Sequence, residues 1–319
     1  MGRMIAGMSD EARSQVFAPR LLYGKVALVT GGGTGLGKAT AIELARCGAT
    51  VVIAGRRAWT LEAAALQIAA AVGAGANGAG NTDSAARADV AAGAGQADWV
   101  MGDVREQADA QRLITTVLER HGQLDVLINN AGGQYFAPAE GIVAKGWRAV
   151  WRLNVEGMLN MSEAAVERGM GLVAEGKGGC AIVNVTLSPH HGMPGMAHSG
   201  AARATVEALT RELAKRWADR KITVTAAAAG HFDTEAVLKY PDSVRAGMAR
   251  SVPFQRVGRP EEHAWLVALL CSPLGRALNG STVTLDGARD NWFGPWPPPG
   301  LTGDTGEVPT EARRGLGPG

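Results

Sequence analysis

The sequence has few cysteines, almost no net charge and no long apolar run. Its three cysteines, Cys47, Cys180 and Cys271, have neither metal-site nor redox-motif spacing, which suits a reducing compartment. The formal net charge of +2 gives no electrostatic reason to expect nucleic acid or an anionic membrane surface as a partner. No apolar run approaches the roughly 20 residues of a membrane span.

The two ends of the sequence carry no targeting pattern. Residues 1–20 contain Arg3, Asp10 and Glu11 and no continuous apolar block, unlike a secretory signal. The final Gly-Pro-Gly is not a peroxisomal tripeptide. We therefore expect a soluble, cytoplasmic protein.

Short aliphatic runs alternate with amphipathic stretches along most of the chain. Strands are expected at 25–30, 50–54, 99–104, 124–128, 180–186, 222–227 and 282–285, and helices at 38–47, 107–121, 144–170, 199–218 and 261–270. This alternation predicts an α/β fold with a single doubly wound parallel sheet of the Rossmann type and helices on both faces.

Composition divides the chain into an N-terminal extension (1–20), a nucleotide-binding domain (21–288) and a Trp/Pro-rich tail (289–319). Inside the domain, residues 71–97 are mostly alanine and glycine, which predicts a flexible surface insertion. The tail holds Trp292, Trp296 and several prolines, so it cannot form a helix or a central strand. We expect it to lie extended over the protein or a neighbouring subunit, with disorder as the alternative.

A glycine-rich turn joins the first expected strand to the first expected helix. Gly31, Gly35 and Gly37 have the spacing Gly-x-x-x-Gly-x-Gly. Such a turn lets the backbone approach a pyrophosphate, which then lies at the positive end of the helix. Its place in a strand–turn–helix–strand unit predicts nucleotide binding, against the alternative of a purely structural turn.

The second expected strand ends in Arg56 and Arg57. A carboxylate at this place would bind the ribose hydroxyls of NAD. Two guanidinium groups instead favour a 2′-phosphate, with Thr34 and Lys38 as further contributors. NADPH is therefore the expected cofactor, unless both arginines are ordinary solvated residues.

Four motifs in order resemble the short-chain dehydrogenase/reductase superfamily over roughly residues 22–287. They are the glycine turn, Asn129-Asn130-Ala131-Gly132, Asn154 within Leu-Asn-Val-Glu-Gly, and the strand, loop and helix of 182–203. The resemblance implies that Asp103 and Val104 lie by the adenine and Gly230 near the nicotinamide, usually in a homotetramer. The complete expected cofactor set is Gly31, Thr34, Gly35, Leu36, Gly37, Arg56, Arg57, Asp103, Val104, Asn130, Ala131, Gly132, Arg203 and Gly230, with no metal.

The sequence departs from that superfamily at two positions. Ordinary members use a tyrosine that protonates the carbonyl oxygen and a lysine one helical turn later, where this chain has Ser199 and Arg203. The two positions still share a helix face. A serine hydroxyl is a far weaker acid than a phenol, and arginine cannot exchange a proton at neutral pH. We expect Arg203 to keep the ribose contact while the proton relay for alcohols and ketones is lost.

The run from His198 to Ala204, with Asn129 to Gln134 and Lys145-Gly146-Trp147, narrows the resemblance. It is similar to peroxisomal-type trans-2-enoyl-CoA reductases, 2,4-dienoyl-CoA reductases and citronellol-type dehydrogenases. This implies NADPH-dependent reduction of an activated C=C bond in an enoyl thioester. There the hydride goes to the β-carbon, and the thioester oxygen needs hydrogen-bond donors as charge builds on it.

The candidate catalytic residues are Asn154, Ser199, Arg203, His190 and Tyr135. Asn154 would anchor water or substrate, and Tyr135 follows the Asn-Asn-Ala-Gly turn, where packing beside Phe136 is an equal alternative. His190 and, less so, His191 lie in the loop after the fifth strand and titrate near neutrality. His231 could line the pocket, and residues 231–250 are expected to form a substrate lid.

Two other functions stay open, and a third is disfavoured. The first is an alcohol or ketone oxidoreductase acting on a terpenoid or another hydrophobic carbonyl, since no basic cluster is shaped for the phosphates of coenzyme A. The second is an NADPH-binding isomerase, cyclase or regulator without redox turnover. A hydrolase using Ser188 and His190 is disfavoured, because they lie two residues apart on a loop without a strand-to-helix nucleophile turn.

Overall fold

The computed structural model describes residues 14–18, 20–73, 97–171, 179–188, 195–235, 237–239 and 242–291. Several expectations lie outside this range. They concern most of the N-terminal extension, residues 74–96 of the Ala/Gly insertion, the tail beyond residue 291, and both His190 and His191.

The strands form one seven-stranded parallel sheet in the order β3-β2-β1-β4-β5-β6-β7, so the expected doubly wound α/β fold is confirmed. Their bounds are β1 Val26–Thr30, β2 Thr50–Gly55, β3 Ala97–Met101, β4 Val126–Asn129, β5 Cys180–Leu187, β6 Ile222–Ala229 and β7 Thr282–Leu285. The order reverses between β1 and β4, and ligands of such sheets bind outside the carboxyl ends of the strands at that point.

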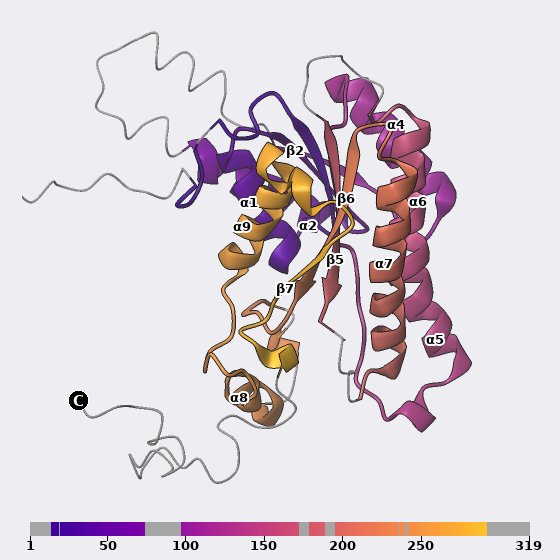
Figure 1. Ribbon diagram of the computed structural model, residues 1–319, viewed down its shortest axis with the longest axis vertical. Helices are drawn as coiled ribbons and strands as arrows, with labels where there is room; N and C mark the ends of the chain where they lie inside the picture. The colour runs from indigo at the N-terminus through magenta and orange to yellow at the C-terminus, as the bar shows by residue number, and fades with distance from the viewer. Residues whose placement is uncertain are drawn as a thin grey trace, which may run out of the picture.

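Helices cover both faces of the sheet (Figure 1). On one face lie α1 (Gly35–Arg46), α2 (Ala58–Gly73) and α9 (Pro260–Cys271); on the other lie α4 (Gln107–His121), α6 (Gly157–Glu167) and α7 (Ala197–Arg216). Each face has its own apolar core, one built around Leu44, Leu61 and Val267, the other around Leu113, Met161 and Val206. Strands buried on both faces explain why the strand segments are continuously apolar.

Two elements differ from the sequence expectation. Helix α2 was not expected, although Leu61, Ala64, Ala65 and Ile68 are its buried residues at helical spacing. The long helix expected over 144–170 is instead α5 (Ala144–Trp151), a π-helical turn over Arg152–Glu156, and α6. The π-helical turn contains Asn154 and marks a local change in backbone hydrogen bonding that often accompanies a functional site.

Segment 231–250, expected as a lid, contains helix α8 (Asp242–Arg250).

Over the residues with described positions, each helix is too short or too polar to cross a bilayer.

Candidate active site

A pocket of about 770 Å³ opens where the carboxyl ends of the strands meet. Residues that follow each of the seven strands contribute to its lining, as does Met248 of α8. Every residue of the expected cofactor set lies in this lining, from the glycine turn to Gly230. The sequence motifs therefore converge on one cavity.

The glycine turn and the Asn-Asn-Ala-Gly segment are locked together. The Asn130 side-chain amide donates to the carbonyl oxygens of Thr30 at 3.0 Å and Gly31 at 3.3 Å. The Thr30 hydroxyl accepts from the backbone N–H groups of Asn130 and Ala131, both at 3.0 Å. A Cβ atom at Gly37 would lie 2.4 Å from the Asn130 amide nitrogen, so only glycine fits there.

This turn fits a pyrophosphate. Gly31 and Gly35 have φ of +65° and +54°, in the region that favours glycine. Helix α1 has no acidic residue in its first turn, and its N-cap Thr34 makes no side-chain cap hydrogen bond. The helix start thus combines close backbone approach with a positive dipole end that favours an anion, and in this structure the Glu235 carboxylate accepts from the Gly35 N–H there at 2.9 Å.

The pocket lining is strongly basic. Its described residues include four arginines, Arg56, Arg57, Arg203 and Arg289, and a single carboxylate, Asp103. That carboxylate is occupied, since the Arg105 Nε donates to its Oδ1 at 2.9 Å, and this contact lowers the pKa of Asp103. The cavity therefore favours a ligand with several negative charges.

Arg203 is a buried cation, with 7% of its surface exposed. One Nη donates to the Val185 carbonyl at 3.0 Å, and its Nε has no hydrogen-bond partner among the described residues. Burial lowers the pKa of Arg203 to about 10, so the group stays charged at neutral pH. A Cβ atom at Gly132 would lie 2.7 Å from the other Nη. The guanidinium therefore lies directly against the Asn-Asn-Ala-Gly segment.

Asn154 has its hydrogen-bonding groups directed into the protein. Its Nδ2 donates to the carbonyls of Gly133 at 2.9 Å and Val150 at 2.7 Å, and its Oδ1 accepts from the Gly133 N–H at 3.2 Å. The side chain is buried and is not among the described residues that line the pocket. Asn154 therefore holds the loop after β4 beside Arg203, whereas the sequence suggested contact with water or substrate.

Two other candidates also lie outside the described lining. Ser199 is fully buried, and its Oγ has no hydrogen-bond partner among the described residues. The Tyr135 hydroxyl lies directly against Gly146 of α5, and its ring packs edge-on against His198 with centroids 4.5 Å apart. The structure thus brings Arg203 into the pocket, whereas Ser199, which is buried, and Tyr135, which is 41% exposed, lie outside its described lining.

Sequence reasoning missed Arg289 as a pocket residue. It follows β7 and lines the cavity with Ser188 and His231. The Ser188 hydroxyl donates to Asp286 Oδ2 at 3.2 Å. Burial lowers the pKa of His231 to about 4, with a further lowering by Arg289 that Asp286 opposes. The position of Arg289 four residues after the last residue of a parallel strand was the available signal, since such strand ends gather at one edge.

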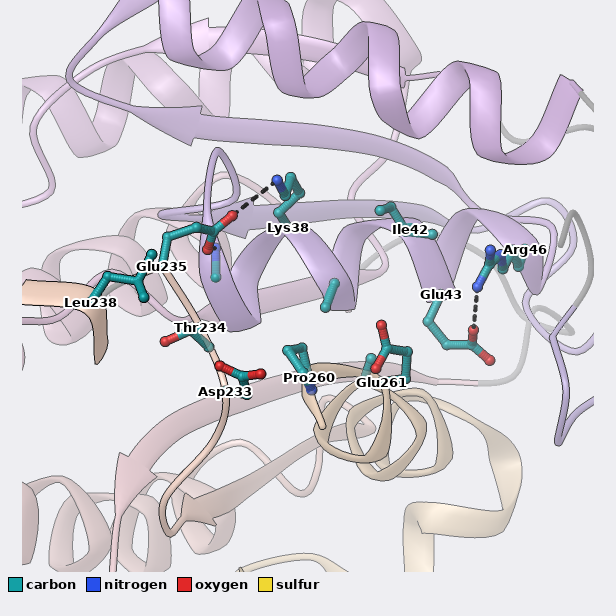
Figure 2. Close-up of a pocket in the computed structure, with 13 residues that line it drawn as sticks. Lys38, Ile42, Glu43, Arg46, Asp233, Thr234, Glu235, Leu238, Pro260 and Glu261 are labelled. Carbon is teal, nitrogen blue, oxygen red and sulfur yellow. Dashed lines mark hydrogen bonds and ion pairs between the residues drawn. The ribbon is translucent and has the colours of Figure 1, made fainter. Parts of the chain in front are cut away.

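A second pocket of about 410 Å³ lies between α1 and α9 (Figure 2). Glu235 reaches across it to the glycine turn, where its carboxylate accepts from the Gly35 N–H at 2.9 Å and pairs with Lys38 at 3.2 Å. Lys38, expected near a 2′-phosphate, therefore faces this second pocket. In the described parts of the chain, no three His, Cys, Asp or Glu side chains gather in a way that could hold a metal ion.

Comparison with known families and proteins agrees with this geometry. The Enoyl-(Acyl carrier protein) reductase family matches residues 76–288, and the short chain dehydrogenase family matches residues 25–97. A probable 2,4-dienoyl-CoA reductase of Bacillus subtilis is 33% identical over 279 residues, covering 86% of this chain and 98% of that protein.

Two solved structures from Pseudomonas aeruginosa are also similar. The citronellol catabolism dehydrogenase AtuB has a TM-score of 0.68 and 32% identity, covering 86% of this chain and 98% of that one. The RhlG/NADP active-site complex has a TM-score of 0.73 and 27% identity, covering 86% and 100%. With the parallel sheet, the glycine turn and these matches together, the chain belongs to the short-chain dehydrogenase/reductase superfamily of oxidoreductases.

Proposed function

We propose that this protein is an NADPH-dependent reductase of an activated C=C bond, with an enoyl thioester as substrate. The observation that carries the cofactor assignment is the basic lining of the large pocket, in which Arg56, Arg57 and Arg203 accompany one ion-paired carboxylate. A similar structure that contains NADP supports the same cofactor, and a 2,4-dienoyl-CoA reductase among the relatives supports the substrate class.

Different residues of the pocket would bind different parts of the cofactor. The turn at Gly31, Gly35 and Gly37 would hold the pyrophosphate, and Arg56 and Arg57 the 2′-phosphate. Asp103 and Val104 would border the adenine, Arg203 would donate to the ribose hydroxyls, and Gly230 would lie by the nicotinamide. When bound, the reduced nicotinamide supplies a hydride for the reaction.

The placement of the acids favours C=C over C=O reduction. Reduction of a ketone needs a proton donor next to the oxygen that is bonded to the hydride-accepting carbon. In the superfamily a tyrosine is this donor. Here Ser199 occupies that place, is fully buried and lies outside the described pocket lining, and the Tyr135 phenol lies against α5. Reduction of an enoyl thioester needs stabilisation of charge on the thioester oxygen and then a proton at the α-carbon, which water can provide.

A second candidate is an alcohol or ketone oxidoreductase with a terpenoid substrate. Similarity to a citronellol catabolism dehydrogenase favours it. An NADPH-binding protein without redox turnover is the third candidate, because the tyrosine and lysine are both replaced.

We also propose that the protein is cytoplasmic and forms a homotetramer. Light scattering of the purified protein would test the tetramer.

Substrate profiling separates these functions. The protein would be mixed with NADPH and crotonyl-CoA, longer enoyl-CoAs or simple ketones, and with NADP and citronellol, while the nicotinamide absorbance is followed. We expect NADPH oxidation with the enoyl-CoAs and a much slower reaction with ketones. Turnover of citronellol alone would favour the second candidate, and tight NADPH binding without oxidation in any mixture would rule out the reductase.

A further inference from the structure

The large pocket has a second cationic end, far from Arg56. Arg289 follows β7, whereas Arg56 follows β2. Five strand spacings separate these two strands in the sheet, or about 24 Å at roughly 4.8 Å each. Arg289 is therefore too remote to share the 2′-phosphate, and its charge faces a different part of the bound ligands.

The Arg289 guanidinium lacks a partner in the described structure. Its Nε is buried without a hydrogen bond, and no ion pair joins it to a described carboxylate. The nearby Asp286 is already engaged. Its oxygens accept the backbone N–H groups of Ala288 at 3.0 Å and Asp290 at 2.7 Å, besides the Ser188 hydroxyl. A partly desolvated guanidinium without a counter-charge is unfavourable unless a ligand supplies one.

His231 stands beside this group in the pocket lining. With its pKa lowered to about 4, the imidazole is neutral at pH 7 and offers one ring N–H donor without adding charge. Ser188 contributes by holding Asp286 through its own hydroxyl proton. Arg289 and His231 thus both line this end of the cavity, and both side chains carry hydrogen-bond donors.

We propose that Arg289, with His231 beside it, forms an oxyanion subsite that binds a negatively charged oxygen derived from the carbonyl group of the substrate. Planar guanidinium donors match a carboxylate or an enolate oxygen in charge and geometry. If the negatively charged oxygen belongs to an enolate formed during reduction, this proposal rests on the proposed function. The same subsite would also bind a substrate that carries a free carboxylate.

The enolate form follows from the electron count. When the β-carbon of an enoyl thioester accepts a hydride from NADPH, the C=C π electrons shift toward the thioester oxygen and leave an enolate. Arg289 stabilises that charge. The α-carbon then takes a proton from water, and the C=O bond re-forms. One hydride and one proton have been added across the double bond, and NADPH has become NADP⁺.

The test compares Arg289→Gln and Arg289→Lys with a control, Arg112→Gln, whose arginine lies on α4 and pairs with Asp109. Three quantities would be measured: the Kd of NADPH, the Kd of crotonate for the NADP⁺ complex by calorimetry, and kcat/KM for crotonyl-CoA. Circular dichroism and urea unfolding would establish that each variant folds. Arg289→Lys keeps the positive charge but lacks the paired N–H donors of the guanidinium. Its crotonate Kd and its kcat/KM for crotonyl-CoA should therefore lie between those of Arg289→Gln and the wild type.

We expect Arg289→Gln to leave NADPH binding within about twofold and to weaken crotonate binding at least tenfold. The kcat/KM for crotonyl-CoA should fall about 100-fold or more, the size of effect that removal of one oxyanion donor has on kcat. Arg112→Gln should match the wild type in all three quantities.

The two possible ligands of the subsite, a thioester enolate and a free carboxylate, predict different results in these measurements. Arg289-dependent crotonate binding without crotonyl-CoA turnover would establish a carboxylate subsite while the proposed function fails. Arg289-dependent turnover without crotonate binding would establish the enolate form. If Arg289→Gln changes neither quantity, or if the wild type neither binds crotonate nor reduces crotonyl-CoA, the subsite is overturned.

Discussion

Arg203→Met should make the ligand-free protein more stable while weakening its response to NADPH. The wild-type guanidinium is buried, has no ion-pair partner among the described residues, and has its pKa lowered to about 10 by burial. At about 1.4 kcal/mol for each pKa unit, holding the charge in the ligand-free fold costs roughly 3 kcal/mol. Loss of the hydrogen bond to the Val185 carbonyl offsets about 1 kcal/mol of the gain.

The ligand-free variant should therefore unfold with a free energy about 1–2 kcal/mol above that of the wild type, since an apolar side chain of similar length is often the more stable occupant of such a site. NADPH at 100 times the wild-type Kd stabilises the wild type by about 2.7 kcal/mol. With a Kd weakened tenfold, the variant would gain only about 1.4 kcal/mol at the same concentration.

Urea unfolding followed by circular dichroism, with and without NADPH, measures both quantities. Arg112→Met on exposed α4 serves as the matched control, for which neither quantity should change beyond about 0.5 kcal/mol. The reasoning is refuted if ligand-free Arg203→Met is clearly less stable than the wild type, or if NADPH stabilises both proteins equally.

Three further predictions concern His263 of α9, Gly132 in the pocket lining and the buried Asn154. Burial lowers the pKa of His263 to about 4, so between roughly pH 6.5 and 4 only the unfolded chain binds a proton there. The free energy of unfolding therefore decreases as the pH is lowered through this range. In His263→Leu this part of the decrease should vanish in urea unfolding, and an unchanged dependence on pH would contradict the prediction. Gly132→Ala places a methyl group 2.7 Å from an Arg203 Nη and should weaken NADPH binding at least tenfold, whereas Gly73→Ala, with open space around it, should bind NADPH normally. Asn154→Ala leaves buried groups of Gly133 and Val150 unpaired and should lower the unfolding free energy by about 2–3 kcal/mol; a stable Asn154→Ala protein with lost turnover would instead indicate direct contact with substrate.

The sheet and the convergence of the sequence motifs on one pocket were predictable because their signals are local. Apolar runs ended by glycine or asparagine mark parallel strands, and strand ends gather at one edge, so the motifs at Gly31, Arg56 and Asn130 had to converge. Helix α2 escaped because its buried positions include Ala64 and Ala65, and alanine gives little contrast between the two faces of a helix.

The catalytic side was less predictable because it depends on where side chains point. A π-helical turn changes the backbone around Asn154 without a distinctive composition, and it turns that carboxamide toward Gly133. Tyr135 follows the expected turn, yet its hydroxyl lies against α5. Arg289 belongs to a stretch interpreted as the start of a tail, and the order β5-β6-β7 in the sheet brings it to the same pocket as Ser188 and His231.

The claim at the centre of this account is that the large pocket binds NADPH through Arg56, Arg57 and Arg203. A fluorescence titration of the ligand-free protein with NADPH and with NADH tests it most directly, alongside the Arg56→Ser/Arg57→Ser double variant. We predict that the wild type binds NADPH at least tenfold more tightly than NADH, and that the double variant loses this preference while retaining NADH binding. Equal or tighter binding of NADH by the wild type, or a preference for NADPH that survives in the double variant, would contradict the account.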